Sequence, residues 1–160
     1  MAEGHQRYKV SWFEEPVTSD DLRGMQLVRK KIPARTKVAA GEYGYTVDYF
    51  KSMLESSAVD VLQADATRCG GITGFMKVSG LCEAFHVPFS AHCAPSLHLH
   101  PSLAIKNMIH VEYFRDHVRI EEMLFEGYAR AENGIIYPDL DRNGLGLEFK
   151  FNDAEKFKMT

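Results

Sequence analysis

Four carboxylates and one histidine recur along the chain with a regular spacing. They are Glu14, Glu42, Asp65, His92 and Glu112. Successive members are separated by roughly 20 to 30 residues, which is the length of one strand–helix unit of a (β/α) barrel. Taken singly, each acid is more simply a solvated loop residue or a helix cap. Their joint periodicity favours one shared site.

These residue types suit removal of a proton beside a carboxylate. Glu14 and Glu42 offer the oxygen ligands that Mg²⁺ prefers. Asp65 can hold one imidazole nitrogen of His92 and turn the other toward a substrate, so that His92 acts as a base or acid near neutral pH. Glu112 can hydrogen-bond the carboxylate of the substrate. A metal ion would stabilise the ene-diolate that forms.

Each of the five polar residues lies at the end of, or within, a short apolar segment that is typical of a strand. We expect strands at residues 10–13, 37–40, 59–64, 87–91 and 110–114. Helical spacing of apolar residues predicts intervening helices that end before Pro33, cover 75–85 and run through 97–108. Ser19 and Thr46 are the expected N-caps of the first two helices. Gly70 and Gly71 are interpreted as a turn.

Alternating strands and helices predict parallel pairing, because a parallel return needs a long crossover connection. The expected fold class is therefore α/β, as the C-terminal part of a (β/α) barrel with about five parallel strands. A complete barrel takes about 250 residues, so the barrel is incomplete. We expect a leader of unclear structure at residues 1–9 and the partial barrel domain at 10–160. The chain then either forms a homo-oligomer or requires the missing barrel half.

Composition narrows the class of protein. The 160 residues carry 19 basic and 22 acidic side chains, and no basic cluster is longer than residues 29–31, which argues against a nucleic-acid partner. No apolar stretch approaches the ~20 residues of a membrane span. Three cysteines in no zinc spacing indicate reduced thiols and a cytoplasmic protein. Cys93 has no evident base partner in the sequence.

Several local strings resemble the enolase superfamily, and within it the mandelate racemase-like group. They are WFEEP at 12–16, AGE at 40–42, LQAD at 62–65, GGIT at 70–73 and SAH at 90–92. The resemblance runs from about Val10 to the C-terminus. It implies that Glu14 and Glu42 are magnesium ligands and that Asp65 and His92 form a general acid/base dyad. It also implies that Glu112 hydrogen-bonds the carboxylate of a small-molecule substrate, an acid sugar or hydroxy acid.

The resemblance implies a magnesium-dependent lyase, an acid-sugar dehydratase. A hydroxy-acid racemase or epimerase, an isomerase, begins with the same proton abstraction and stays as an alternative. A second alternative is a truncated, non-catalytic remnant, because the Lys-x-Lys motif, the third metal-binding acid and the capping domain of the family are not found before Trp12. Nearness to strand ends makes Tyr43, Tyr45, Arg68 and His98 candidates for substrate contact.

Overall fold

Five parallel strands form one sheet in the computed structural model, which describes residues 8–159. They are β1 (Trp12–Glu14), β2 (Lys37–Ala40), β3 (Val61–Ala64), β4 (Phe89–Ala91) and β5 (Met108–Val111), hydrogen-bonded in that order. The predicted α/β class and partial barrel are confirmed. Most of the leader expected at residues 1–9 lies outside the described residues.

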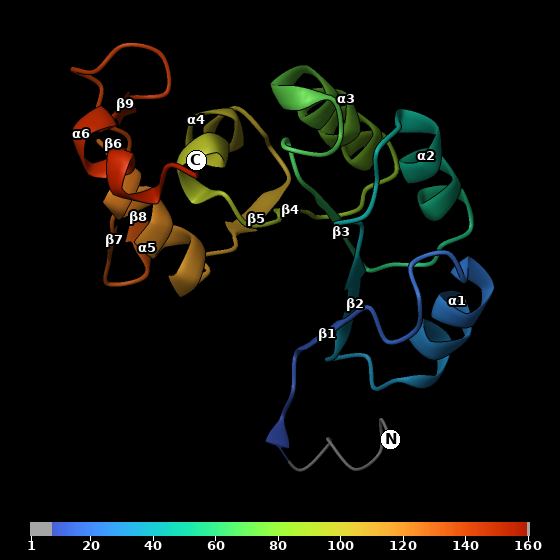
Figure 1. Cartoon of the computed structure of the whole chain (residues 1–160). Helices are drawn as coiled ribbons and strands as arrows, with labels where there is room; N and C mark the ends of the chain where they lie inside the picture. Colours follow the sequence, from blue (N-terminus) through green and yellow to red (C-terminus); the bar gives the residue numbers. More distant parts are fainter. Residues whose placement is uncertain (1–7, 160) are drawn as a thin grey trace.

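A helix follows each strand: α1 (Leu22–Lys31), α2 (Val47–Glu55), α3 (Gly71–Ala84), α4 (Pro95–Leu103) and α5 (Arg115–Leu124). Figure 1 shows α1, α2 and α3 side by side along one face of the sheet. The predicted cap Thr46 is confirmed, since its side chain accepts a hydrogen bond from the Tyr49 amide. The prediction that Ser19 caps the first helix is wrong. Asp21 caps α1 by accepting from the Gly24 amide.

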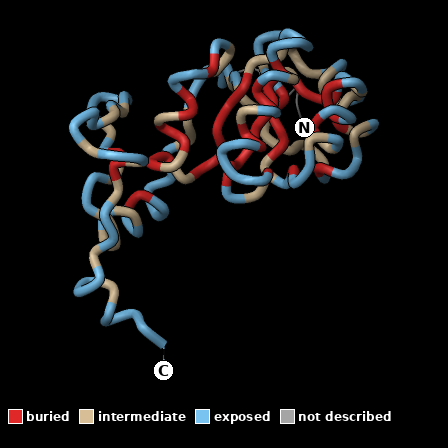
Figure 2. Tube along the Cα trace, turned by 90° about the horizontal axis from the view of Figure 1, so that it is seen from above, coloured by how far each residue is buried: buried red, intermediate tan, exposed pale blue. Residues whose placement is uncertain are grey.

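The core lies between the sheet and these three helices. Strand β3 is buried over its whole length, as expected of a strand covered on both faces. Phe50 of α2 and Phe75 of α3 are fully buried in one hydrophobic cluster with residues of β3, Met25 of α1 and Phe89 of β4. The buried segments gather at the sheet and its helices in Figure 2. This packing fixes the strand ends that carry the polar residues.

The sheet is curled, so that its two outer strands approach each other. The rings of Trp12 on β1 and His110 on β5 lie 4.9 Å apart between centroids. Side chains from both strands line a hollow of about 670 Å³, among them Glu14 and Glu112. A curled parallel sheet is the geometry of a barrel wall. The hollow is therefore the concave side of the partial barrel.

The C-terminal part consists of short elements: β6 (Phe125–Glu126), β7 (Ala131–Glu132), β8 (Ile135–Ile136), β9 (Glu148–Phe149), α6 (Phe151–Ala154) and the 3₁₀ helix η2 (Glu155–Phe157). Strands β6 and β9, and β7 and β8, pair antiparallel. Much of this part is exposed (Figure 2). Among the described residues, no helix combines the length and apolarity needed to cross a bilayer.

Candidate active site

The strand ladder aligns the predicted residues at one edge of the sheet. Glu14 is the last residue of β1, and Asp65, His92 and Glu112 each follow directly after a strand. The ladder continues into them, because the His92 amide donates to the Ala64 carbonyl and the Glu112 amide to the Ala91 carbonyl. Parallel register therefore brings residues far apart in sequence to a common edge.

Asp65 and His92 form the hydrogen-bonded pair that the sequence predicts. His92 Nδ1 lies 3.0 Å from Asp65 Oδ2, and both side chains are nearly buried. The other oxygen, Oδ1, accepts hydrogen bonds from the amide and the hydroxyl of Thr67. Burial alone would raise the pKa of Asp65, but these hydrogen bonds lower it to about 2. Asp65 is thus ionised, Nδ1 carries the proton, and Nε2 faces the site.

His92 Nε2 meets two carboxylates, Glu42 beyond the end of β2 and Glu112 directly after β5. It lies 3.1 Å from Glu42 Oε2 and 4.0 Å from Glu112 Oε2. Burial would lower the pKa of His92, but the hydrogen bond with Asp65 and the charges of Glu42 and Glu112 raise it above its usual value. The geometry suits a group that takes up or delivers a proton at Nε2.

Glu112 is held from one side by Gln63, which donates to Oε1 at 2.5 Å. Its second oxygen, Oε2, is buried and has no hydrogen-bond partner among the described residues. Burial, followed by the charge of Glu14, raises the pKa of Glu112. Sequence reasoning gave Gln63 no role. The one available signal was a polar residue inside an otherwise apolar, central strand.

Glu14 and Glu15 both lie among the acidic side chains around the site. Glu14 Oε2 accepts a hydrogen bond from the indole of Trp12. Strand alternation predicts that Glu15 points away, but its φ of 38° breaks the alternation. Its Oε1 is buried without a hydrogen-bond partner among the described residues. Burial, then the charges of Glu42 and Glu14, raise the pKa of Glu15.

The acidic residues around the site can be compared with what a magnesium ion requires. The charges of Glu42 and Glu14 add to burial in raising the pKa of Glu15, and the charge of Glu14 does the same for Glu112. One buried oxygen of Glu15 and one of Glu112 lack a hydrogen-bond partner among the described residues. Oxygen donors with uncompensated negative charge are what a hard divalent cation requires. The residues therefore fit magnesium, with Glu42 and Glu14 flanked by a third acid, Glu15.

Two further residues complete the wall of the site. Arg68 Nη1 donates to the Glu42 carbonyl at 3.0 Å and approaches Glu42 Oε1 at 3.4 Å, while its Nε is 3.9 Å from Asp65 Oδ2. The ring of Tyr43 lies beside the Arg68 guanidinium, 5.4 Å from its central carbon. Arg68 therefore links the strand ends of β2 and β3. Tyr45 is 64% exposed.

His98 is not placed to contact a substrate, which corrects the sequence-based interpretation. The side chain is fully buried in α4. Its Nδ1 lies 2.8 Å from the Cys93 carbonyl, and its Nε2 accepts from the Ala66 amide at 2.9 Å. Burial lowers the pKa of His98. Its neutral ring ties the loops after β3 and β4 together.

Cys93 does have a basic neighbour, contrary to the sequence-based view. Its Sγ lies 3.1 Å from His92 Nε2. Burial, then the charges of Glu112 and Asp65, raise the pKa of the Cys93 thiol to about 12. A thiol held protonated in this way is a poor nucleophile.

Comparisons with known proteins agree with this geometry. Residues 1–154 match the family described as enolase C-terminal domain-like. The D-mannonate dehydratase CC0532 of Caulobacter vibrioides is 28% identical over 156 residues, which cover 93% of this chain and 38% of that protein.

Solved structures of the same kind of protein are also similar to this chain. A mandelate racemase/muconate lactonizing enzyme-like protein from Rubrobacter xylanophilus has a TM-score of 0.92 and 45% identity, covering 97% of this chain and 43% of that one. An L-talarate dehydratase from Polaromonas sp. JS666, complexed with Mg and L-glucarate, has a TM-score of 0.80 and 26% identity, covering 96% and 41%. The chain thus spans about two fifths of the length of these relatives.

Proposed function

We propose that the site of this chain serves a magnesium-dependent dehydratase of acid sugars. The premise is that the chain belongs to the enolase C-terminal domain-like family and to its mandelate racemase-like group. The supporting observation is the state of His92. Its Nδ1 is fixed by ionised Asp65, and its Nε2 faces the carboxylates of Glu42 and Glu112. Two of the reported relatives are acid-sugar dehydratases by name.

The residues divide the chemistry among them. Glu14 and Glu42 would hold the magnesium ion, which supplies positive charge for the substrate carboxylate when it is bound. Asp65 keeps His92 in one tautomer. His92 Nε2 takes the proton beside the carboxylate or delivers a proton to the departing hydroxyl. Glu112, held by Gln63, hydrogen-bonds the substrate carboxylate.

The acid/base role of His92 is tested by turnover. The purified protein is incubated with mannonate, galactonate, rhamnonate and talarate, with Mg²⁺ or with a chelator, and the keto-deoxy product is measured. We expect His92→Asn to lower kcat by about 10³-fold, the range of general acid–base catalysis. The matched control is His86→Asn, at an exposed histidine whose φ of 56° asparagine tolerates. Equal losses in both variants would contradict the assignment.

The racemase alternative predicts a different product. In deuterium oxide it would place deuterium beside the carboxylate of recovered substrate without loss of water. Dehydration supports the proposal, whereas exchange without dehydration supports a racemase or epimerase. Magnesium binding without either reaction would support the non-catalytic alternative.

Magnesium binding is measured separately by calorimetry. Glu42→Gln removes one charged ligand and is expected to weaken binding at least about tenfold. The control Glu55→Gln changes an exposed glutamate at the end of α2 and leaves the affinity unchanged. If Glu42→Gln binds magnesium as tightly as the parent protein, Glu42 is not a ligand.

A further inference from the structure

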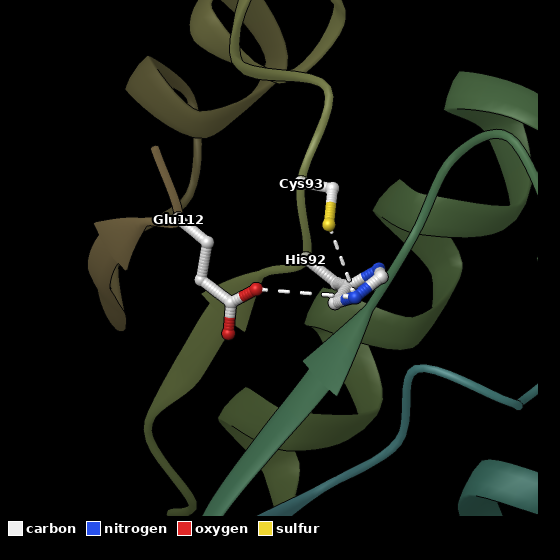
Figure 3. Close-up of side chains that lie close together, drawn as sticks. All are labelled: His92, Cys93 and Glu112. Atoms are coloured by element: carbon white, nitrogen blue, oxygen red, sulfur yellow. Dashed lines mark hydrogen bonds and ion pairs between the residues drawn. The ribbon is translucent and has the colours of Figure 1, made fainter. Parts of the chain in front are cut away.

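Three side chains of different chemistry converge where β4 and β5 end. The Nε2 of His92, the Sγ of Cys93 and a carboxylate oxygen of Glu112 all lie within 4.8 Å of one another. Figure 3 shows the three side chains turned toward a common point. The Cys93 backbone has a φ of 51°, in the left-handed region. Adjacent residues on a regular strand point to opposite faces, so this turn is what allows Cys93 to share a side with His92.

The surroundings of this cluster match those of a metal centre. His92 and Cys93 are buried, and the Glu112 side chain is 12% exposed. Glu112 Oε2 is buried and has no hydrogen-bond partner among the described residues. His92 is oriented through its other ring nitrogen by the Asp65 carboxylate, and histidine ligands of zinc are usually held by a carboxylate or carbonyl in this way. The donors are therefore preorganised, and one of them lacks a partner.

The donor set selects a different ion from the one that the neighbouring glutamates favour. Sulfur, imidazole nitrogen and carboxylate oxygen together suit Zn²⁺ or Co²⁺, with a fourth position open to water. Magnesium takes oxygen ligands and gains nothing from a thiolate. The separation of 3.1 Å between Sγ and Nε2 needs only a small opening to admit an ion with bonds of about 2.3 Å to sulfur and 2.0 Å to nitrogen.

We propose that His92, Cys93 and Glu112 form a second metal site, which binds a thiophilic divalent ion of the Zn²⁺ class and competes with the acid/base role of His92. On binding, the Cys93 thiol releases its proton to solvent, as does Nε2 of His92 where it is protonated. His92 then coordinates through the lone pair of Nε2, while Nδ1 keeps its proton and donates a hydrogen bond to Asp65. The ion-binding part stands on the cluster alone. The inhibitory part rests on the proposed function.

The test uses Co²⁺ as a spectroscopic probe of the full chain in thiol-free buffer. A thiolate ligand gives a sulfur-to-cobalt charge-transfer band in the near ultraviolet. We expect this band to saturate at one Co²⁺ per chain and to be displaced by Zn²⁺ but not by excess Mg²⁺. Absence of the band in the parent protein, or its displacement by Mg²⁺, would overturn the proposal without any variant.

Variants assign the ligands. Cys93→Ser is expected to abolish the band, and Glu112→Gln to weaken Co²⁺ binding at least about tenfold. The matched control is Cys82→Ser, at a fully buried free cysteine in α3 away from the cluster. A band that survives Cys93→Ser, or that Cys82→Ser also removes, would refute the site.

The two proposals fail separately. Glu42→Gln is expected to lose magnesium affinity and keep the sulfur band, whereas Cys93→Ser keeps magnesium binding and loses the band. In an active preparation, micromolar Zn²⁺ should inhibit the parent protein and inhibit Cys93→Ser at least about tenfold less. Equal inhibition of both would show that zinc does not act through this cluster.

Discussion

Asp65→Asn tests the electrostatics of the acid/base pair through stability. The change keeps the side-chain shape and the oxygen that Thr67 can contact, but it removes the charge that faces His92 Nδ1. The folded pKa of Asp65 is about 2, against an ordinary value of 3.8. A lowered pKa contributes stability above pH 3.8, and this contribution is lost as the pH falls toward 2. The difference corresponds to about 2 kcal/mol.

His92 contributes to the stability of the fold with the opposite dependence on pH. Its folded pKa is raised above 6.5, so its contribution is fully present below pH 6.5 and is lost as the pH rises through the folded pKa. The pair therefore stabilises the fold most between about pH 4 and 6.5. In Asp65→Asn, the loss of stability between pH 4 and pH 2 that Asp65 causes should disappear. The loss of stability above pH 6.5 should become smaller, because the hydrogen bond with Asp65 is the largest of the causes that raise the pKa of His92.

Urea unfolding of the parent and variant proteins at a series of pH values measures this directly. The gap in the free energy of unfolding should be about 2 kcal/mol near pH 5 and close to zero near pH 2. The matched control, Asp141→Asn at an exposed position, should stay within about 0.5 kcal/mol of the parent at every pH. A gap that does not change with pH would refute the assigned charge state of Asp65.

Three further substitutions test how the site is supported. Gly41→Ala places a Cβ about 2.0 Å from a β3 carbonyl at a φ of 137°, so urea unfolding should show a loss of about 3 kcal/mol. His98→Leu leaves a buried amide and a buried carbonyl unpaired, with an expected loss of about 2 to 4 kcal/mol by the same assay. Ser96→Ala removes the hydroxyl that joins Glu121 to the Ala129 amide, so limited proteolysis should cut after α5 sooner than in the parent; unchanged cleavage would contradict this anchor.

The sequence by itself determined the parallel order of the strands and the polar residues at their ends. Alternating apolar segments leave few arrangements other than a parallel sheet, and in such a sheet the carboxyl ends of the strands share one edge. Asp65 and His92 could be paired in advance for this reason. Their residue types and local strings also predicted their chemistry.

Other features depended on the tertiary structure, because they arise from backbone turns and from contacts across the sheet. Hydrophobic periodicity carries no information about the positive φ of Glu15 and Cys93. This backbone turn brings Glu15 toward Glu42 and Glu14, and it brings the Cys93 thiol beside His92. The hydrogen bond from Gln63 to Glu112 joins residues on strands that are not neighbours in the sheet. In the sequence, nearness to a strand end makes His98 a candidate for substrate contact, and only its full burial and its hydrogen bonds to two loops show that it holds those loops together.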